Sequence, residues 1–141
     1  SLVLWLAWPE FVPTPGNFLH AVASGNLLFL AGKGPLELRG KVGDAVSKQV
    51  AKQAAREVGL LLIQVMKTEL GELSRVAQIV KVFGFVNADF GFYEHTDVID
   101  GCSEILVEIF GDKAMHARSA IGVGSLPFNI PLEIECVVSF R

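Results

Sequence analysis

HARSAIGVGSLPFNIPLEIECVV, residues 116–138, contains two apolar strand patterns separated by a loop that holds two prolines. The patterns predict strands over residues 117–123 and 132–140. In the second strand apolar side chains alternate with Glu133 and Glu135, so one side is apolar and the other carries both carboxylates. The apolar side suits packing beneath helices. We therefore expect the glutamate side to face solvent or another subunit.

Residues 44–71 predict a long helix. Apolar residues recur every three or four positions between Asp44 and Gly71, which indicates a helix over about residues 45–70 with Asp44 as N-cap and Gly71 as its stop. Gly59 lies inside this helix and is interpreted as a point of close packing. The expected buried stripe consists of Val46, Val50, Ala54, Val58, Leu61 and Val65.

A second helix is expected to end at about Phe110, before Gly111, with Thr96 or Asp97 as its cap. Its inward residues are expected to be Val98, Cys102, Ile105 and Ile109.

Three further strands, and one segment that is a loop or a short edge strand, complete the predicted order. Residues 18–23 and 26–31 indicate a strand pair joined at Ser24-Gly25, and residues 78–86 indicate another strand. Residues 36–43 are a loop or a short edge strand. The fold class is therefore α+β, with a mixed sheet and two helices that can cover only one sheet face. The other face is too apolar for full solvation, which favours an oligomer.

Composition limits the classes of function. Residues 1–17, with three prolines, are an expected irregular lead-in, and residues 18–141 an expected single domain. The chain is 51% hydrophobic and only 19% charged, which argues against disorder. A net charge of −3 predicts no general attraction to nucleic acid or anionic membranes. The apolar run at residues 2–8 is too short to span a membrane. We expect a cytoplasmic location; the alternative is that this run is the end of a signal peptide.

Arg118 is the charged residue that most needs an explanation. It shares one face of its strand with the small residues Ala120 and Gly122, which leaves space beside the guanidinium. A charge in an apolar strand is costly unless it is paired. Arg118 could form a structural ion pair with one of the carboxylates, or it could bind a small carboxylate ligand through its planar fork. Spacing alone leaves both readings open.

Four ordered blocks carry a resemblance to a known family. The RSAIGV run, the LP pair and the LEIE strand of residues 116–138 resemble the C-terminal signature of the YjgF/RidA-like reactive-intermediate deaminases, often labelled endoribonuclease L-PSP. Residues 25–35 (GNLLFLAGKGP), 70–88 and 98–111 agree with that family in the same order. The similarity covers almost everything from residue 16 to residue 140.

This resemblance implies a chorismate-mutase-like fold and a homotrimer whose sheets meet in a central barrel, with clefts between subunits. Active members hydrolyse 2-imino or enamino acids to 2-keto acids and ammonia. Arg118 matches the family arginine that would hold the substrate carboxylate. Glu133 matches the acid associated with water activation, and the surroundings of Gly32, Ala120 and Ile121 would line the cleft.

Several positions depart from the family pattern. Ala31 stands where a serine is common, Lys33 where glutamine is usual, Ala120 where cysteine is frequent, and Phe18 where the deaminase branch has tyrosine. Phe18 and Lys33 are still expected to line the cleft. The alternatives to hydrolysis are a trimer that binds a small carboxylate metabolite without turnover and, less favoured, an RNA-cleaving protein. No cofactor, metal or nucleic-acid partner is expected.

The remaining polar features have simpler interpretations. Lys48, Lys52 and Arg56 recur every four residues and are interpreted as a solvated helix face. Cys102 and Cys136 lack metal-ligand spacing and are interpreted as reduced core residues.

Overall fold

The computed structural model of the chain describes residue 14 and residues 16–141. The apolar run at residues 2–8 and most of the expected lead-in at residues 1–17 lie outside the described residues. Within the described part, no helix is both long enough and apolar enough to cross a membrane.

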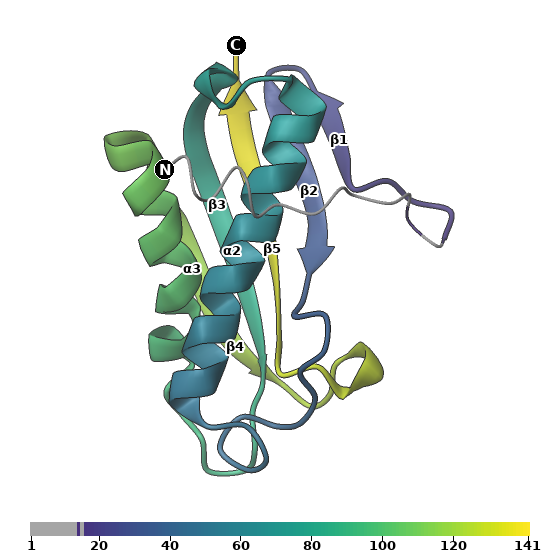
Figure 1. Ribbon diagram of the computed structural model, residues 1–141, viewed down its shortest axis with the longest axis vertical. Helices are drawn as coiled ribbons and strands as arrows, with labels where there is room; N and C mark the ends of the chain where they lie inside the picture. The colour runs from purple at the N-terminus through teal and green to yellow at the C-terminus, as the bar shows by residue number, and fades with distance from the viewer. Residues whose placement is uncertain (1–13, 15) are drawn as a thin grey trace.

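Two layers make up the fold, a five-stranded sheet and two helices laid across one of its faces (Figure 1). The strand order is β1-β2-β5-β3-β4, in which β3 and β4 are parallel and the other pairs are antiparallel. The expected α+β class with a mixed sheet is confirmed. The strands are β1 (Ala21–Ser24), β2 (Leu27–Lys33), β3 (Val76–Asn87), β4 (Ala117–Val123) and β5 (Leu132–Phe140), and the helices are α2 (Lys48–Leu70) and α3 (His95–Phe110).

The first hairpin turns at Gly25, whose positive φ of 60° suits a residue without a side chain. Its first strand is shorter than predicted, because β1 begins at Ala21 and not at residue 18. The pairing of β2 with β5 shifts between Leu30 and Lys33, so the ladder loses its regular register beyond Leu30, the partner of Ala21. Phe18 precedes β1 in the chain and is 55% exposed.

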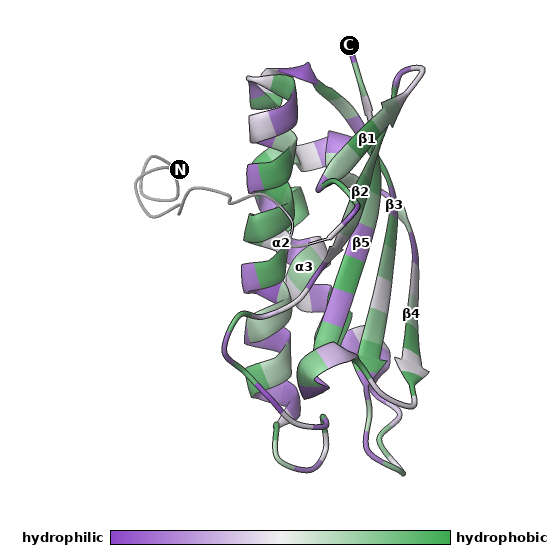
Figure 2. Cartoon of the chain, turned by 90° about the vertical axis from the view of Figure 1, so that its right-hand side faces the viewer, coloured by the Kyte–Doolittle hydropathy of each residue, from purple (hydrophilic) through white to green (hydrophobic). Residues whose placement is uncertain are grey.

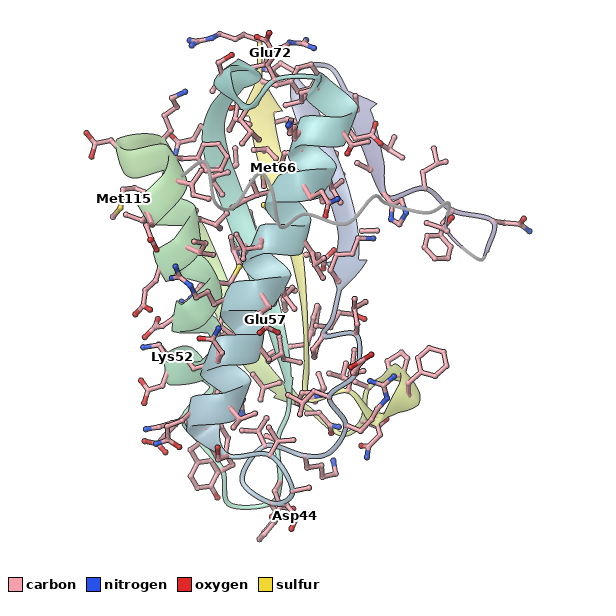
Figure 3. The ribbon with its side chains drawn as sticks, viewed as in Figure 1. Asp44, Lys52, Glu57, Met66, Glu72 and Met115 are labelled. Atoms are coloured by element: carbon pink, nitrogen blue, oxygen red, sulfur yellow. The ribbon has the colours of Figure 1, made fainter. Side chains whose placement is uncertain are left out.

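Helix α2 begins three residues later than predicted. Its N-cap is Ser47, whose Oγ accepts a hydrogen bond from the backbone N–H of Val50 at 3.2 Å. Asp44 lies in the preceding loop (Figure 3), so the predicted cap was wrong. Four residues of the predicted stripe are buried, namely Val46, Ala54, Val58 and Val65. Val50 is 49% exposed and was wrongly included, and the buried face is wider than predicted because it also contains Ala51, Ala55, Leu62 and Met66.

Helix α3 begins at His95, one residue before the first predicted cap. Glu94 occupies the cap position without a side-chain hydrogen bond to the helix. Thr96 and Asp97 instead lie in the first turn, where the positive end of the helix dipole stabilises the carboxylate of Asp97.

Glycines allow the two helices to approach closely. A Cβ on Gly59 of α2 would lie 2.5 Å from Ile105 Cγ2 of α3, which confirms the predicted packing role of this glycine. A Cβ on Gly101 of α3 would collide with the Lys52 carbonyl oxygen of α2. The absence of side chains at these points brings the helix backbones together over the sheet.

No helix in the described part of the chain covers the second face of the sheet (Figure 2). Leu132, Ile134, Cys136 and Val138 of β5 point to the helices and are buried, as predicted from their alternation. Both cysteines are buried and free, and burial raises the pKa of the Cys102 thiol to about 12. We call the uncovered side the open face; its residues include Val22, Phe29, Phe83, Phe85, Ile121, Glu133, Glu135 and Val137.

Candidate functional site

Arg118 lies on the helix side of the sheet, beneath α3. In the parallel pair of β3 and β4 it stands beside Val82, a core residue, so the two side chains share a face. Its Nη1 donates to Asp100 Oδ1 at 2.8 Å and to Ser103 Oγ at 3.0 Å, while Nη2 donates to the Thr96 carbonyl at a long 3.4 Å. The side chain is only 18% exposed. The guanidinium therefore joins β4 to α3.

The carboxylate that pairs with Arg118 was missed from the sequence. The structural alternative was an ion pair with a carboxylate such as those of the last strand, and the partner found here is Asp100 on a helix. The available signal was the spacing of Asp100 and Ser103, which places both on one side of α3.

His116 extends the same network. Its Nε2 lies 2.9 Å from Ser103 Oγ, and its Nδ1 lies 2.5 Å from the Ala114 carbonyl oxygen. A carbonyl can only accept, so Nδ1 carries the proton in the neutral ring and Nε2 accepts from the serine hydroxyl. Burial lowers the pKa of His116, and the charge on Arg118 lowers it further, whereas the hydrogen bond to Ala114 raises it. Burial and the neighbouring guanidinium thus favour the neutral form of the ring.

Glu133 belongs to a second group of residues at the junction of β2 and β5. A Cβ on Gly32 would lie 2.9 Å from both Cδ and Oε2 of Glu133, so the carboxylate rests against the glycine backbone. Burial raises the pKa of Glu133 and the neighbouring Glu135 raises it further, whereas Lys33 opposes both. A half-buried carboxylate with a raised pKa is a stronger base than an ordinary glutamate.

Lys33 follows Gly32 directly and contacts a residue that sequence reasoning did not assign to the site. Its Nζ lies 2.6 Å from His20 Nδ1. Burial lowers the pKa of Lys33, and the nearby charge of Glu133 partly offsets this. An amine and an imidazole thus meet at the end of β2, where Lys33 is paired with Ile134, a residue on the helix-facing side of β5.

The two groups lie on opposite sides of one sheet. Glu133 pairs with Phe85 of β3 on the open face, and β3 separates β5 from β4. Ala120 packs against the core on the same side as Arg118, whereas Ile121 is 41% exposed on the open face. One chain therefore brings Gly32 and Glu133 together, whereas Lys33 pairs with the helix-facing Ile134 and Arg118 lies beneath α3.

The basic residues along α2 do not form an unpaired basic surface. Lys48 pairs with Glu94 and Asp97, Lys52 with Glu104 at 3.1 Å, and Arg56 with Glu108 at 2.8 Å. The predicted solvated face is thus a row of partly exposed ion pairs between α2 and α3. Among the residues that the structure describes, no group of three metal-ligating side chains is found.

A family model matches residues 10–140, nearly the whole chain. Its description is "YjgF/chorismate_mutase-like, putative endoribonuclease". The match includes both groups of residues described above.

Individual proteins agree with the family match. Protein TCP17 of Trypanosoma cruzi is 33% identical over 98% of this chain and 90% of its own length. A solved protein of unknown function, Atu1372 from Agrobacterium tumefaciens, is 34% identical with a TM-score of 0.87, over 93% of this chain and 87% of that one. A structure from Shewanella oneidensis, described as a "putative endoribonuclease", is 27% identical with a TM-score of 0.92, and the match covers 99% of this chain and 95% of that one. The chain belongs to the YjgF/chorismate-mutase-like family, as its signature stretch indicated.

Proposed function

We propose that this protein hydrolyses small 2-imino or enamino acids to 2-keto acids and ammonia in a cleft between subunits. The observation that carries the proposal is Glu133, a half-buried carboxylate of raised pKa held against the backbone of Gly32. An iminium carbon is already electrophilic, so the protein needs to hold the substrate and to place a water beside it. Glu133 takes the proton of that water as it attacks.

Arg118 holds the substrate carboxylate in this proposal. Asp100 and Ser103 both bind its Nη1, which orients the guanidinium, and the contact of Nη2 with the Thr96 carbonyl is long. The Nη2 side of the fork can therefore be offered to a carboxylate with little loss of existing hydrogen bonds.

The separation of Arg118 and Glu133 supports a site made by two chains. A ligand that touches both residues must bind where β4 of one subunit meets β5 of another, because in a single chain the sheet lies between them. Exposed apolar side chains on the open face, including Phe29 at 46% and Val22 at 54%, favour burial of this face against other subunits. We propose the homotrimer implied by the family resemblance. Sedimentation equilibrium at micromolar concentration tests it, and a stable monomer would exclude this cleft.

Turnover is tested with an imine generated in situ from serine or threonine by a dehydratase. The protein should accelerate formation of the 2-keto acid above the spontaneous rate, and the Glu133→Gln variant should lose most of that acceleration. Acceleration that is equal in the parent and the variant would remove Glu133 from the reaction.

Carboxylate binding without turnover is the second candidate, favoured by one specific observation. Arg118 is already neutralised by Asp100, and the nearby Ala120 adds no polar group. Calorimetric binding of 2-oxobutanoate, together with no acceleration of imine hydrolysis, would identify this function. RNA cleavage is less supported, because Lys48, Lys52 and Arg56 of α2 are paired with carboxylates of α3.

A further inference from the structure

The guanidinium of Arg118 begins a chain of hydrogen bonds that ends beyond His116. Its Nη1 donates to Asp100 Oδ1 at 2.8 Å and to Ser103 Oγ at 3.0 Å. Ser103 Oγ lies 2.9 Å from Nε2 of His116, whose Nδ1 lies 2.5 Å from the Ala114 carbonyl oxygen. We propose that His116 is a positioning residue that acts through Ser103 to keep Nη1 of Arg118 turned into the protein, so that the opposite edge of the guanidinium faces a ligand carboxylate. This inference rests on the proposed function for the identity of that ligand.

The two ends of the chain decide the direction of every hydrogen bond in it. A guanidinium can only donate and a carbonyl can only accept. Ser103 Oγ therefore accepts from Arg118 and gives its one proton to Nε2 of His116, while Nδ1 gives its proton to Ala114. The bonds all point the same way, so each one polarises and strengthens the next in this half-buried place.

His116 matters because it fixes the rotation of the Ser103 hydroxyl. A serine within a helix can also donate to a backbone carbonyl of the preceding turn. Without an acceptor at position 116 the hydroxyl can turn to such a carbonyl or to the nearby Asp100 carboxylate, and its lone pairs then no longer stay directed at Nη1. The imidazole thus holds Ser103 in the orientation that Arg118 uses.

The saturation of Nη1 determines which edge of Arg118 is left for a ligand. Nη1 has two N–H groups, and Asp100 and Ser103 use both. Nη2 and Nε form the opposite edge, which can bind a carboxylate side-on through two parallel hydrogen bonds. Among the described residues, this edge has only the long 3.4 Å contact of Nη2 with the Thr96 carbonyl. Fixing Nη1 therefore preorganises the other edge and lowers the ordering cost of binding.

Nitrogen NMR of the ligand-free protein tests the positioning directly. Rotation about the Nε–Cζ bond exchanges the two Nη nitrogens, and hydrogen bonds to Nη1 slow this exchange. The signals of Arg118 are assigned by their loss in Arg118→Lys. We expect the exchange to be roughly 3- to 10-fold faster in His116→Leu and Ser103→Ala, the effect of about one hydrogen bond. His116→Gln keeps an acceptor oxygen and should stay close to the parent.

Ser74→Ala is the matched control, because Ser74 Oγ is exposed and donates to Glu72 at 3.3 Å, away from this chain. It should leave the exchange at Arg118 unchanged. The imidazole signals of the parent, recorded well above the ordinary pKa of histidine, should show the neutral ring of His116 with its proton on Nδ1. Urea unfolding confirms that each variant is folded.

Binding of 2-oxobutanoate, measured by calorimetry on the same samples, tests the consequence for the ligand. We expect affinity to fall roughly 3- to 10-fold in His116→Leu and in Ser103→Ala, and to be nearly retained in His116→Gln. Unchanged exchange at Arg118 in folded His116→Leu would overturn the inference, as would a loss of affinity in His116→Gln equal to that in His116→Leu. Faster exchange in a protein whose parent binds no 2-oxobutanoate would support the positioning by His116 and overturn the carboxylate site of the proposed function.

Discussion

Replacing Arg118 by lysine tests how β4 is fastened to α3. Lysine keeps the charge but has one terminal nitrogen, so it cannot reach Asp100, Ser103 and the Thr96 carbonyl with the fixed geometry of the guanidinium. Hydrogen bonds that involve a charged group contribute about 1.5–3 kcal/mol each, whereas exposed ion pairs contribute about 0.2–1 kcal/mol. The Arg118 side chain is 18% exposed, so the energy of its pairing should lie between these two ranges, and a lysine would recover part of it. We therefore expect Arg118→Lys to lower the free energy of unfolding by about 1–2 kcal/mol.

Arg56 offers a control of the same chemistry in a more exposed place. Its Nη2 lies 2.8 Å from Glu108, the same distance as in the pair of Arg118 and Asp100, but its side chain is 34% exposed and that of Glu108 is 58% exposed. Arg56→Lys should change the free energy of unfolding by less than about 0.5 kcal/mol. Urea unfolding of the parent and both variants gives the comparison, at one chain concentration because association shifts the apparent stability.

The two readouts for Arg118→Lys test different statements. If the stability cost equals that of Arg56→Lys, the argument that burial and the additional acceptors strengthen the Arg118 pair is wrong. Calorimetric titration with 2-oxobutanoate tests the carboxylate clamp separately, where we expect a loss of about 1.5–3 kcal/mol. A destabilised variant whose parent binds no carboxylate would leave Arg118 a purely structural residue.

Three further changes address the remaining groups. Glu133→Gln should lower turnover by roughly 100-fold or more while 2-keto acid binding survives, as steady-state rates and calorimetry will show. Gly32→Ala should push the Glu133 carboxylate from its place, since the new Cβ would lie 2.9 Å from it, and should reduce turnover in a folded protein; Gly124→Ala, where nothing lies within 4 Å, is the control and should leave turnover unchanged. The folded-state pKa of His116 lies below its ordinary value of 6.5, so the unfolded chain binds more protons there and stability should fall as the pH drops below 6.5. His116→Gln should lose this share of the pH dependence, and urea unfolding above and below pH 6.5 would contradict the assignment if the difference between parent and variant stayed constant.

Much of the secondary structure was predictable because it depends on local periodicity. The alternation in residues 132–140 predicted which side chains of β5 are buried, and the spacing between residues 45 and 70 predicted the long helix. The errors lie at ends and faces. Asp44 and Ser47 are both acceptable N-caps by residue type, and only the path of the chain through the preceding loop decided for Ser47.

The sequence by itself determined the elements, their order and the candidate residues Arg118 and Glu133, because residue type and spacing carry that information. It also indicated that one sheet face lacks a helical cover. The alternation of β5 already predicted that Glu133 points away from the helices. Only the tertiary structure decided that Arg118 lies on the helix side, because the pattern of β4 does not state which of its sides meets the helices. The pairing of Arg118 with Val82 and of Glu133 with Phe85 settles this. The structure also identified Asp100 as the partner of Arg118 and His20 as the partner of Lys33. These residues are distant in the chain and meet only on folding, so the sequence does not show which neighbours compensate a buried charge.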